Sequence, residues 1–154
     1  MSTEILTEPA GPGAAARRIA GGSRTTVWAG RIVSGLVVVF LAFDAVGKVL
    51  EVPAVVEGTV RLGYPAGVVF GLGIVLLACV LAYAIPRTSV LGAILLTGYL
   101  GGAVATHVRV GDPLLSHVLF PVYVAVLAWT GLYLRDDRLR ALLRARAPTP
   151  PSPR

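Results

Sequence analysis

The sequence predicts an all-α integral membrane protein, a four-helix bundle with a short interfacial helix between its first and second spans. Hydrophobic residues make up 55% of the 154 residues and charged residues 14%, whereas soluble domains carry about 25% charged residues. Four segments come close to the roughly 20 apolar residues needed to cross the hydrocarbon core of a bilayer. Lipid offers backbone groups no hydrogen-bonding partner, so each of these segments must be helical.

The four apolar segments lie within a single membrane domain, which we place at residues 25–135. They cover residues 27–50, 62–85, 88–106 and 113–134. The second and third contain no charged residue, the first contains Arg31 near its start and Asp44 and Lys48 further in, and the fourth is interrupted only by His117. The domain is therefore expected to cross the membrane four times.

Turn-forming residues separate these segments. Pro86 with Thr88 and Ser89 predicts a tight turn between the second and third spans, with a hydroxyl to cap the next helix. At the third connection, Asp112 is the expected N-cap and Pro113 the expected first residue of the last helix. These signals support the count of four.

The first connection is longer and predicts a short helix that lies in the membrane interface. Pro53 opens it and Gly63 closes it. Its valines fall mostly on one side, while Glu57 and Arg61 form an i,i+4 pair on the other. This pattern is typical of an interfacial helix and is too short for a fifth span.

The two ends of the chain are expected to differ from the membrane domain. Residues 1–24 are rich in Gly, Ala, Pro and Arg without periodicity, which predicts disorder. No small-x-small cleavage pattern follows the first apolar run, so that run is expected to stay in the protein. Residues 136–154 predict a short basic amphipathic helix followed by a Pro-rich end that cannot be helical.

The distribution of Lys and Arg predicts the orientation. Eleven of the 14 basic residues lie in the N-terminal segment, the second connection and the C-terminal segment, and the other three are Lys48, Arg61 and Arg109. The positive-inside rule therefore places both termini in the cytoplasm. The net charge of +6 follows the ends of the spans and lines no single face, which argues against nucleic acid as a partner.

Several classes of chemistry lack their motifs. The single cysteine, Cys79, excludes dithiol-disulfide chemistry within the chain. No dinucleotide-binding glycine motif, phosphate-binding loop or nucleophile motif is present. His107 and His117 are ten positions apart, without a His-x-x-His motif or a Cys/His cluster that would complete a metal site, so no metal is expected.

Asp44 and Lys48 are ionisable residues well inside a span, and such residues are functional candidates because their desolvation is costly. They are spaced i,i+4 with the acid first, which is the favourable order for an ion pair. Two interpretations remain open. The pair belongs to a binding site, or the two charges neutralise each other and only fix the helix.

The topology brings further polar residues to the same end of the bundle. His107 ends the third span and His117 lies near the start of the fourth. Tyr64 and Arg109 are expected at the rim of the same region, near the Asp44–Lys48 pair. We therefore predict a ligand site from these six residues. The alternative is that helix ends are polar because they meet headgroups and water.

Two glycine pairs predict helix-packing faces. Gly67 with Gly71, and Gly98 with Gly102, have the G-x-x-x-G spacing that lets helices approach closely in lipid. Glycine is also common in membrane helices generally, so chance spacing is the alternative.

Several motifs in order resemble the DoxX-like family of small four-helix bacterial membrane proteins. They are residues 43–48 (FDAVGK), 62–65 (LGYP), 98–109 (GYLGGAVATHVR), 111–113 (GDP), His117 and 120–121 (FP). The resemblance covers residues 31–139. It implies a four-helix bundle in the bacterial cytoplasmic membrane, and some relatives are associated with thiosulfate:quinone oxidation or with a membrane oxidoreductase complex.

Three functions follow as hypotheses. The first is an accessory subunit of a membrane redox system that binds a quinone-like molecule, with a membrane or periplasmic oxidoreductase as partner. The second is a small transporter that uses Asp44 and Lys48, and the third is a structural or assembly protein without a site. Quinone is the one cofactor implied, and lipid is an expected contact. The sequence leaves open whether the protein is an enzyme and whether it forms a homo-oligomer.

Overall fold

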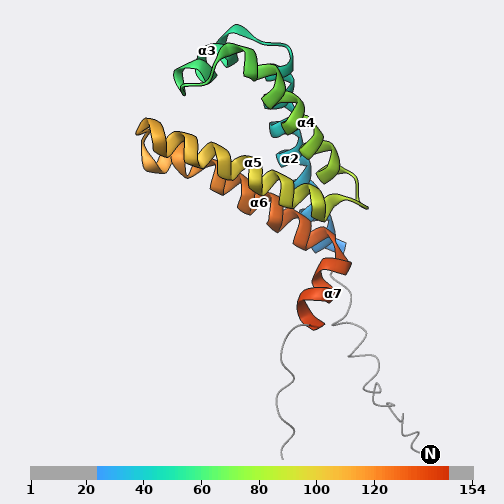
Figure 1. Ribbon diagram of the computed structural model, residues 1–154. Helices are drawn as coiled ribbons and strands as arrows, with labels where there is room; N and C mark the ends of the chain where they lie inside the picture. The colour runs from blue at the N-terminus through green and yellow to red at the C-terminus, as the bar shows by residue number, and fades with distance from the viewer. Residues whose placement is uncertain (1–23, 146–154) are drawn as a thin grey trace, which may run out of the picture.

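The computed structural model describes residues 24–145, and every regular element in that range is helical (Figure 1). In chain order the elements are α2 (Arg24–Val49), α3 (Pro53–Arg61), η1 (Ala66–Val68), α4 (Val69–Ala84), α5 (Ser89–Val110), η2 (Leu114–Val118), α6 (Phe120–Arg135) and α7 (Asp137–Ala145). η1 runs into α4, and η2, a π-helix, leads into α6.

Four helical stretches are long and apolar enough to cross a membrane. They are Arg24–Val49, Ala66–Ala84, Ser89–Val110 and Leu114–Arg135. The short helix α3 lies between the first and second of them. The predicted fold class is therefore confirmed. The predicted disorder of the N-terminal segment and the Pro-rich C-terminal end fall on residues 1–23 and 146–154, which lie outside the described residues, while Arg24 already begins α2.

Glycine and proline mark the ends of the helices. Gly111 closes α5 with φ +74°, and its N–H group bonds to the carbonyls of the last turn. Gly63 follows α3 with φ +85°. Only glycine adopts such angles without a steric cost, so the turns that the sequence predicts at both points depend on it. Pro53 is at the first position of α3, as expected.

Two predicted helix caps are wrong. The Thr88 hydroxyl donates to the carbonyl of Ala82 at 2.8 Å instead of capping α5. Pro113, and not Asp112, occupies the N-cap position of η2, and no side chain caps that helix. Each side chain pairs elsewhere: the Thr88 hydroxyl donates to a carbonyl, and the Asp112 carboxylate pairs with the ring nitrogen of His107 at 2.6 Å.

The helices pack tightly at one end and diverge at the other (Figure 1). α2 packs against α4 and α6, while α5 packs against α4 and α6 on its own side. Near α7 the four long helices lie side by side. Toward the opposite end, α3 and the ends of α2 and α4 form one arm, and the ends of α5 and α6 form the other.

We call the tightly packed end of the bundle, near α7, the arginine end, because it carries Arg24, Arg31, Arg87 and Arg135. The opposite end is the histidine end, where Asp44, Lys48, Tyr64, His107, Arg109 and His117 lie.

Close helix contacts are made by glycines other than those predicted. A Cβ atom added at Gly92 would lie 2.2 Å from the backbone nitrogen of Tyr83. At Gly30 the nearest atoms belong to Arg135 and Leu134, at 2.7 Å. Gly131 and Gly73 are also in tight contacts, against α2. Glycines thus allow the helix backbones to pack closely, as is common for helices in lipid. The closest contact, between Gly92 and Tyr83, is near the arginine end.

The four predicted packing glycines face open space. A Cβ at Gly67, Gly71, Gly98 or Gly102 would meet nothing within 4 Å. Within the described part of the chain these residues therefore form no close helix contact. A packing role toward a second copy or another protein stays a prediction.

A buried hydrogen-bond network links α2, α4 and α6 at the arginine end. The Tyr83 hydroxyl donates to the Ala128 carbonyl at 2.7 Å and lies 3.0 Å from the Ser34 hydroxyl. Because the only proton of the phenol is used on Ala128, Ser34 donates to Tyr83. Arg135 donates to the Tyr83 carbonyl at 2.8 Å, with its guanidinium 4.8 Å from the ring centre. No pattern in the sequence predicts this network.

Candidate functional site

Asp44 and Lys48 form the predicted ion pair. The Lys48 ammonium donates directly to the Asp44 carboxylate, one turn apart on α2. The Lys48 side chain is 14% exposed and that of Asp44 is 38% exposed. Pairing cancels the net charge that either side chain alone would bring into the membrane. The more exposed carboxylate and the remaining ammonium hydrogens are still free to meet a ligand.

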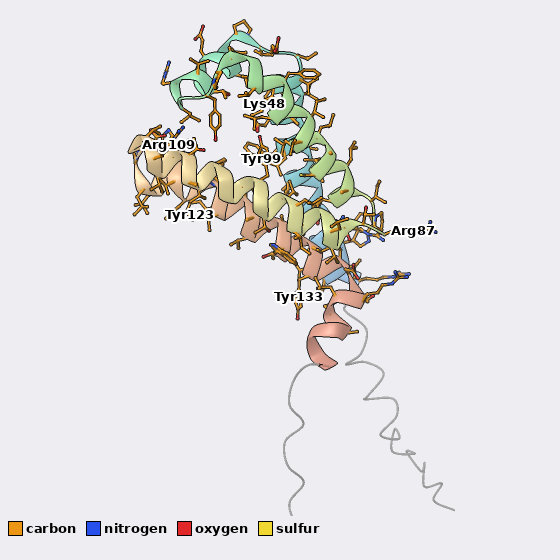
Figure 2. The ribbon with its side chains drawn as sticks, viewed as in Figure 1. Lys48, Arg87, Tyr99, Arg109, Tyr123 and Tyr133 are labelled. Atoms are coloured by element: carbon orange, nitrogen blue, oxygen red, sulfur yellow. The ribbon has the colours of Figure 1, made fainter. Side chains whose placement is uncertain are left out.

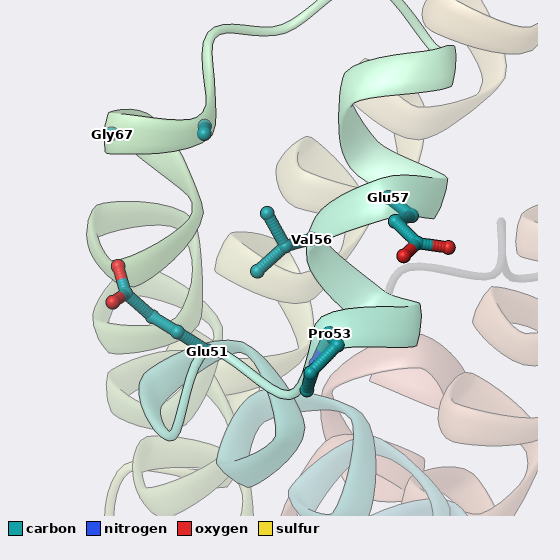
Figure 3. Close-up of a pocket in the computed structure, with 6 residues that line it drawn as sticks. Glu51, Pro53, Val56, Glu57 and Gly67 are labelled. Carbon is teal, nitrogen blue, oxygen red and sulfur yellow. The ribbon is translucent and has the colours of Figure 1, made fainter.

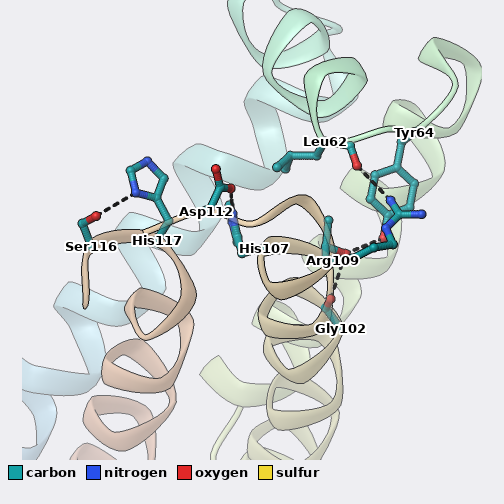
Figure 4. Close-up of polar contacts among 9 residues, drawn as sticks. Leu62, Tyr64, Gly102, His107, Arg109, Asp112, Ser116 and His117 are labelled. Atoms are coloured by element: carbon teal, nitrogen blue, oxygen red, sulfur yellow. Dashed lines mark hydrogen bonds and ion pairs between the residues drawn. The ribbon is translucent and has the colours of Figure 1, made fainter. Parts of the chain in front are cut away.

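Tyr64 and Arg109 tie the two arms of the histidine end together (Figure 4). The Tyr64 hydroxyl lies 2.8 Å from the Thr106 hydroxyl, which itself donates to the Gly102 carbonyl at 2.9 Å. Tyr64 is therefore the donor to Thr106. Arg109 donates to the Leu62 carbonyl at 2.9 Å, and its guanidinium lies 5.8 Å from the centre of the Tyr64 ring.

The two histidines lie next to each other, as the topology predicts (Figure 4). Their ring centres are 5.9 Å apart, with an interplanar angle of 61°. His107 Nδ1 lies 2.6 Å from Asp112 Oδ2, and His117 Nδ1 lies 2.8 Å from the Ser116 hydroxyl. Each Nδ1 thus has a partner, and Nε2 is the nitrogen left to meet a ligand.

His117 lies in the π-helix η2, which brings it close to His107. The wider turn is closed by bonds from Val118 to Pro113 and from Leu119 to Leu114. A π-turn contains one extra residue, so it shifts the side chains that follow relative to a regular α-helix. π-Turns are rare and frequently occur at functional sites. Periodicity in the sequence gave no sign of this turn.

The six predicted site residues form three separate groups and not one network. These are Asp44 with Lys48, Tyr64 with Arg109, and His107 with His117. Among residues 24–141, whose side chains are described, no hydrogen bond joins the ion pair to either histidine. Figure 2 shows Lys48 on one arm and Arg109 and Tyr99 on the other, on the sides that face each other.

The structure adds partners that the sequence analysis missed. Asp112 was assigned to a helix cap, but its carboxylate pairs with His107. The Thr106 hydroxyl accepts a hydrogen bond from Tyr64, and the Ser116 hydroxyl is hydrogen-bonded to Nδ1 of His117. Asp112 follows the turn that ends α5, a few residues after His107, and residues on either side of a tight turn lie close together. This position was the one feature of the sequence from which the pairing of Asp112 with His107 could have been predicted. No group of three or more His, Cys, Asp or Glu residues in the described range is placed to hold a metal ion.

Two surface grooves lie outside this cluster. One, of about 420 Å³, runs between α3 and η1 and is lined by Glu51, Pro53, Val56, Glu57, Ala66 and Gly67 (Figure 3). The other, of about 450 Å³, lies at the arginine end and is lined by Trp129, Thr130, Tyr133 and Leu139. None of the six predicted ligand-binding residues lines either groove.

Four membrane-length helices with polar side chains gathered at one end define a small multi-pass membrane protein. The DoxX-like family matches residues 32–131, well over half of the chain, so the protein belongs to the DoxX-like family. The resemblance drawn from the sequence motifs is therefore confirmed. The matched region contains all six predicted site residues and Asp112, and ends before α7. Comparison with curated proteins and with solved structures found no match.

Proposed function

We propose that the histidine end binds the polar head of an amphipathic, carbonyl-bearing molecule such as a quinone, and that the protein is an accessory subunit of a membrane redox system. The observation that carries the proposal is the placement of three pairs of polar side chains, on two facing arms, at one end of the bundle. Sites of this kind, apolar with a few convergent polar groups, suit an amphipathic ligand.

The histidines supply the groups that would recognise a carbonyl oxygen. His107 keeps Nδ1 on Asp112, so when the ring is protonated its Nε2–H is free to donate to a ligand. His117 is exposed and its Nδ1 is held by Ser116. An imidazole ring can both accept and donate a proton, so either histidine could pass a proton to a quinone that takes one up on reduction.

Lys48 supplies positive charge on the opposite arm. Its ammonium has three hydrogens and the Asp44 carboxylate accepts from it directly. A ligand oxygen that becomes negative on reduction would be stabilised by this ammonium in a region of low dielectric. Arg109 is fixed between the Leu62 carbonyl and the Tyr64 ring, and so forms a rigid rim.

An accessory role is favoured over electron transfer by the chain itself. The sequence contains one cysteine, which is buried in α4, and so offers no dithiol. We propose a membrane or periplasmic oxidoreductase as the partner that exchanges electrons with the bound molecule. We also propose that the protein lies in the bacterial cytoplasmic membrane with the arginine end in the cytoplasm, because basic residues concentrate there.

A binding titration tests the ligand class. The full-length protein in nanodiscs is titrated with a short-chain naphthoquinone, and binding is measured by calorimetry. His107→Ala and His117→Ala should each weaken binding by about ten-fold, the loss typical of one charge-assisted hydrogen bond. Tyr123→Phe is the control, since Tyr123 is an exposed tyrosine of α6 outside the cluster. Equal affinity in all four proteins would exclude the site.

A second candidate function is a small transporter that uses the ion pair. The observation that favours it is the Asp44 carboxylate, 38% exposed although it lies on a membrane-spanning helix. Flux of protons or small ions into vesicles that contain the protein, lost in Asp44→Asn, would support transport. Absence of flux together with naphthoquinone binding would leave the redox proposal as the better one.

A further inference from the structure

A groove with mainly apolar walls lies at the arginine end, at the opposite end of the bundle from the proposed ligand site. It is formed by Trp129, Thr130 and Tyr133 of α6 and by Leu139 of α7. Its volume of about 450 Å³ lies within the range of about 300–1,000 Å³ that small-molecule sites occupy. Its walls are mainly apolar, and Tyr133 projects from α6 close to α7 (Figure 2).

Specific hydrogen bonds hold both walls in place. The Trp129 indole N–H donates to the Thr97 hydroxyl at 2.9 Å, which fixes the ring against α5. On the other side, Asp136 turns the chain after α6 and its carboxylate accepts from the N–H groups of Arg138 and Leu139. This caps α7, and Leu139 then packs against the hydrophobic core. These bonds fix the Trp129 ring on one side of the groove and the first turn of α7 on the other.

The chemistry around the groove combines aromatic rings with positive charge. The Tyr133 side chain is 41% exposed, and its hydroxyl has no hydrogen-bond partner among the described residues. Arg138 is exposed and forms no ion pair with any described side chain. Tryptophan, tyrosine and arginine together at the end of a span are typical of the level where lipid headgroups lie.

Arg140 follows Leu139 in α7 and is a buried donor. It is 7% exposed, and its guanidinium pairs with Asp137. Its Nε–H has no partner among the described residues, although buried N–H groups are rarely left without an acceptor. Among the residues whose side chains are described, this end is basic, because six arginines (Arg24, Arg31, Arg87, Arg135, Arg138 and Arg140) outnumber two aspartates, Asp136 and Asp137.

We propose that this groove binds one anionic phospholipid, with an acyl chain along Trp129 and Leu139 and the phosphate held by Arg138 and the Tyr133 hydroxyl. The apolar lining selects a lipid chain over a soluble anion, and the basic surroundings select an anionic headgroup over a neutral or zwitterionic one. Bound lipid would also hold α7 against the end of α6. This site is independent of the proposed ligand site at the histidine end.

Native mass spectrometry of the full-length protein in mild detergent tests the proposal. Phosphatidylglycerol and phosphatidylcholine with the same acyl chains are titrated in turn, and bound lipid is counted. Phosphatidylglycerol should bind more tightly. Arg138→Gln should weaken its binding by about five-fold, the contribution of one arginine near an anionic headgroup. Tyr133→Ala should weaken the binding of both lipids, because it removes part of the apolar wall.

Arg87→Gln is the matched control. It removes one exposed arginine at the same end of the bundle, in the connection between α4 and α5, and Figure 2 shows Arg87 on the opposite side from Tyr133. Its affinity should equal that of the parent protein. An equal loss in Arg87→Gln and Arg138→Gln would replace the site with a diffuse positive field. Equal binding of the two lipids, or displacement of phosphatidylglycerol by soluble glycerol phosphate, would also contradict the proposal.

Discussion

The two ends of the bundle use polar residues in opposite ways. At the arginine end, Ser34 and Tyr83 are fully buried and satisfy each other and a backbone carbonyl. At the histidine end, Asp44, His107 and His117 pair with neighbours on their own helix or across one turn, and all remain partly exposed. The first arrangement holds helices together, whereas the second leaves donors and acceptors available to a ligand.

The glycines of α5 show the same contrast, while Gly73 of α4 makes a close contact with Lys48 and Val49 nearer the histidine end. Glycines permit close contact at the arginine end, where Gly92 meets Tyr83 and Gly30 meets Arg135. Toward the histidine end the glycines of α5, such as Gly98 and Gly102, face open space. In lipid, helices associate through close packing and not through a hydrophobic driving force, so the tight end is expected to provide most of the stability.

The largest effect is expected at Gly92. Gly92→Ala would place a Cβ 2.2 Å from the Tyr83 backbone, which cannot move aside as a side chain can. We expect a loss of about 3 kcal/mol or more, at or above the upper range for overpacking. Gly98→Ala, in the same helix, meets nothing and should be neutral or slightly stabilising. Thermal unfolding in detergent measures both, and a similar loss in the two variants would contradict the contrast.

The ion pair should show coupling in a double-mutant cycle. Asp44→Leu or Lys48→Leu alone leaves one charge without its partner in a membrane helix, whereas the double variant leaves none. We expect a coupling energy of about 1–3 kcal/mol between the two positions. Unfolding of the four proteins by denaturant in detergent gives this value. Additive losses would mean that the pair contributes nothing beyond its two members.

A smaller loss is expected from the buried tyrosine. Tyr83→Phe removes the hydroxyl that links Ser34 to Ala128 and leaves a buried acceptor and donor unpaired. The expected cost is about 1–2 kcal/mol. Tyr123→Phe, at an exposed tyrosine of α6, should cost less than about 0.5 kcal/mol. Equal melting temperatures for the two variants would show that the hydrogen-bond network around Tyr83 has no structural role.

The orientation of the chain in the membrane is tested by reporter fusions and not by a measurement of stability. Reporter fusions after Arg135 should be active in the cytoplasm, and fusions near Glu57 and Gly111 should be active outside it. The motivation is the placement of eleven of the 14 basic residues. A reporter after Arg135 that is active outside would invert the assignment of the two ends.

Composition and hydropathy were sufficient to predict the four membrane-length helices and the short helix between the first two, since lipid permits few other structures. Topology alone was sufficient to predict that His107 and His117 would meet, because one ends a span and the other begins the next. The i,i+4 spacing was sufficient for the Asp44–Lys48 pair. These features depend on local rules and on the alternation of direction between spans.

Features that depend on three-dimensional contacts were not predictable in this way. The G-x-x-x-G spacing selected Gly67, Gly71, Gly98 and Gly102, but the spacing does not say which face of a helix is turned inward. The π-turn at η2 cannot be read from the hydrophobic periodicity of the sequence. Asp112 has an N-cap preference that the nearby imidazole of His107 overrides.

The most direct test of the account is to extract the protein from its native membrane in mild detergent and identify bound small molecules by mass spectrometry. The parent protein and Gly98→Ala should carry the same amphipathic carbonyl compound in similar amounts. The double variant His107→Ala/His117→Ala should lose it while its melting temperature stays close to that of the parent. Recovery of no such compound from the parent protein, or its full retention in the double histidine variant, would contradict a ligand site at the histidine end.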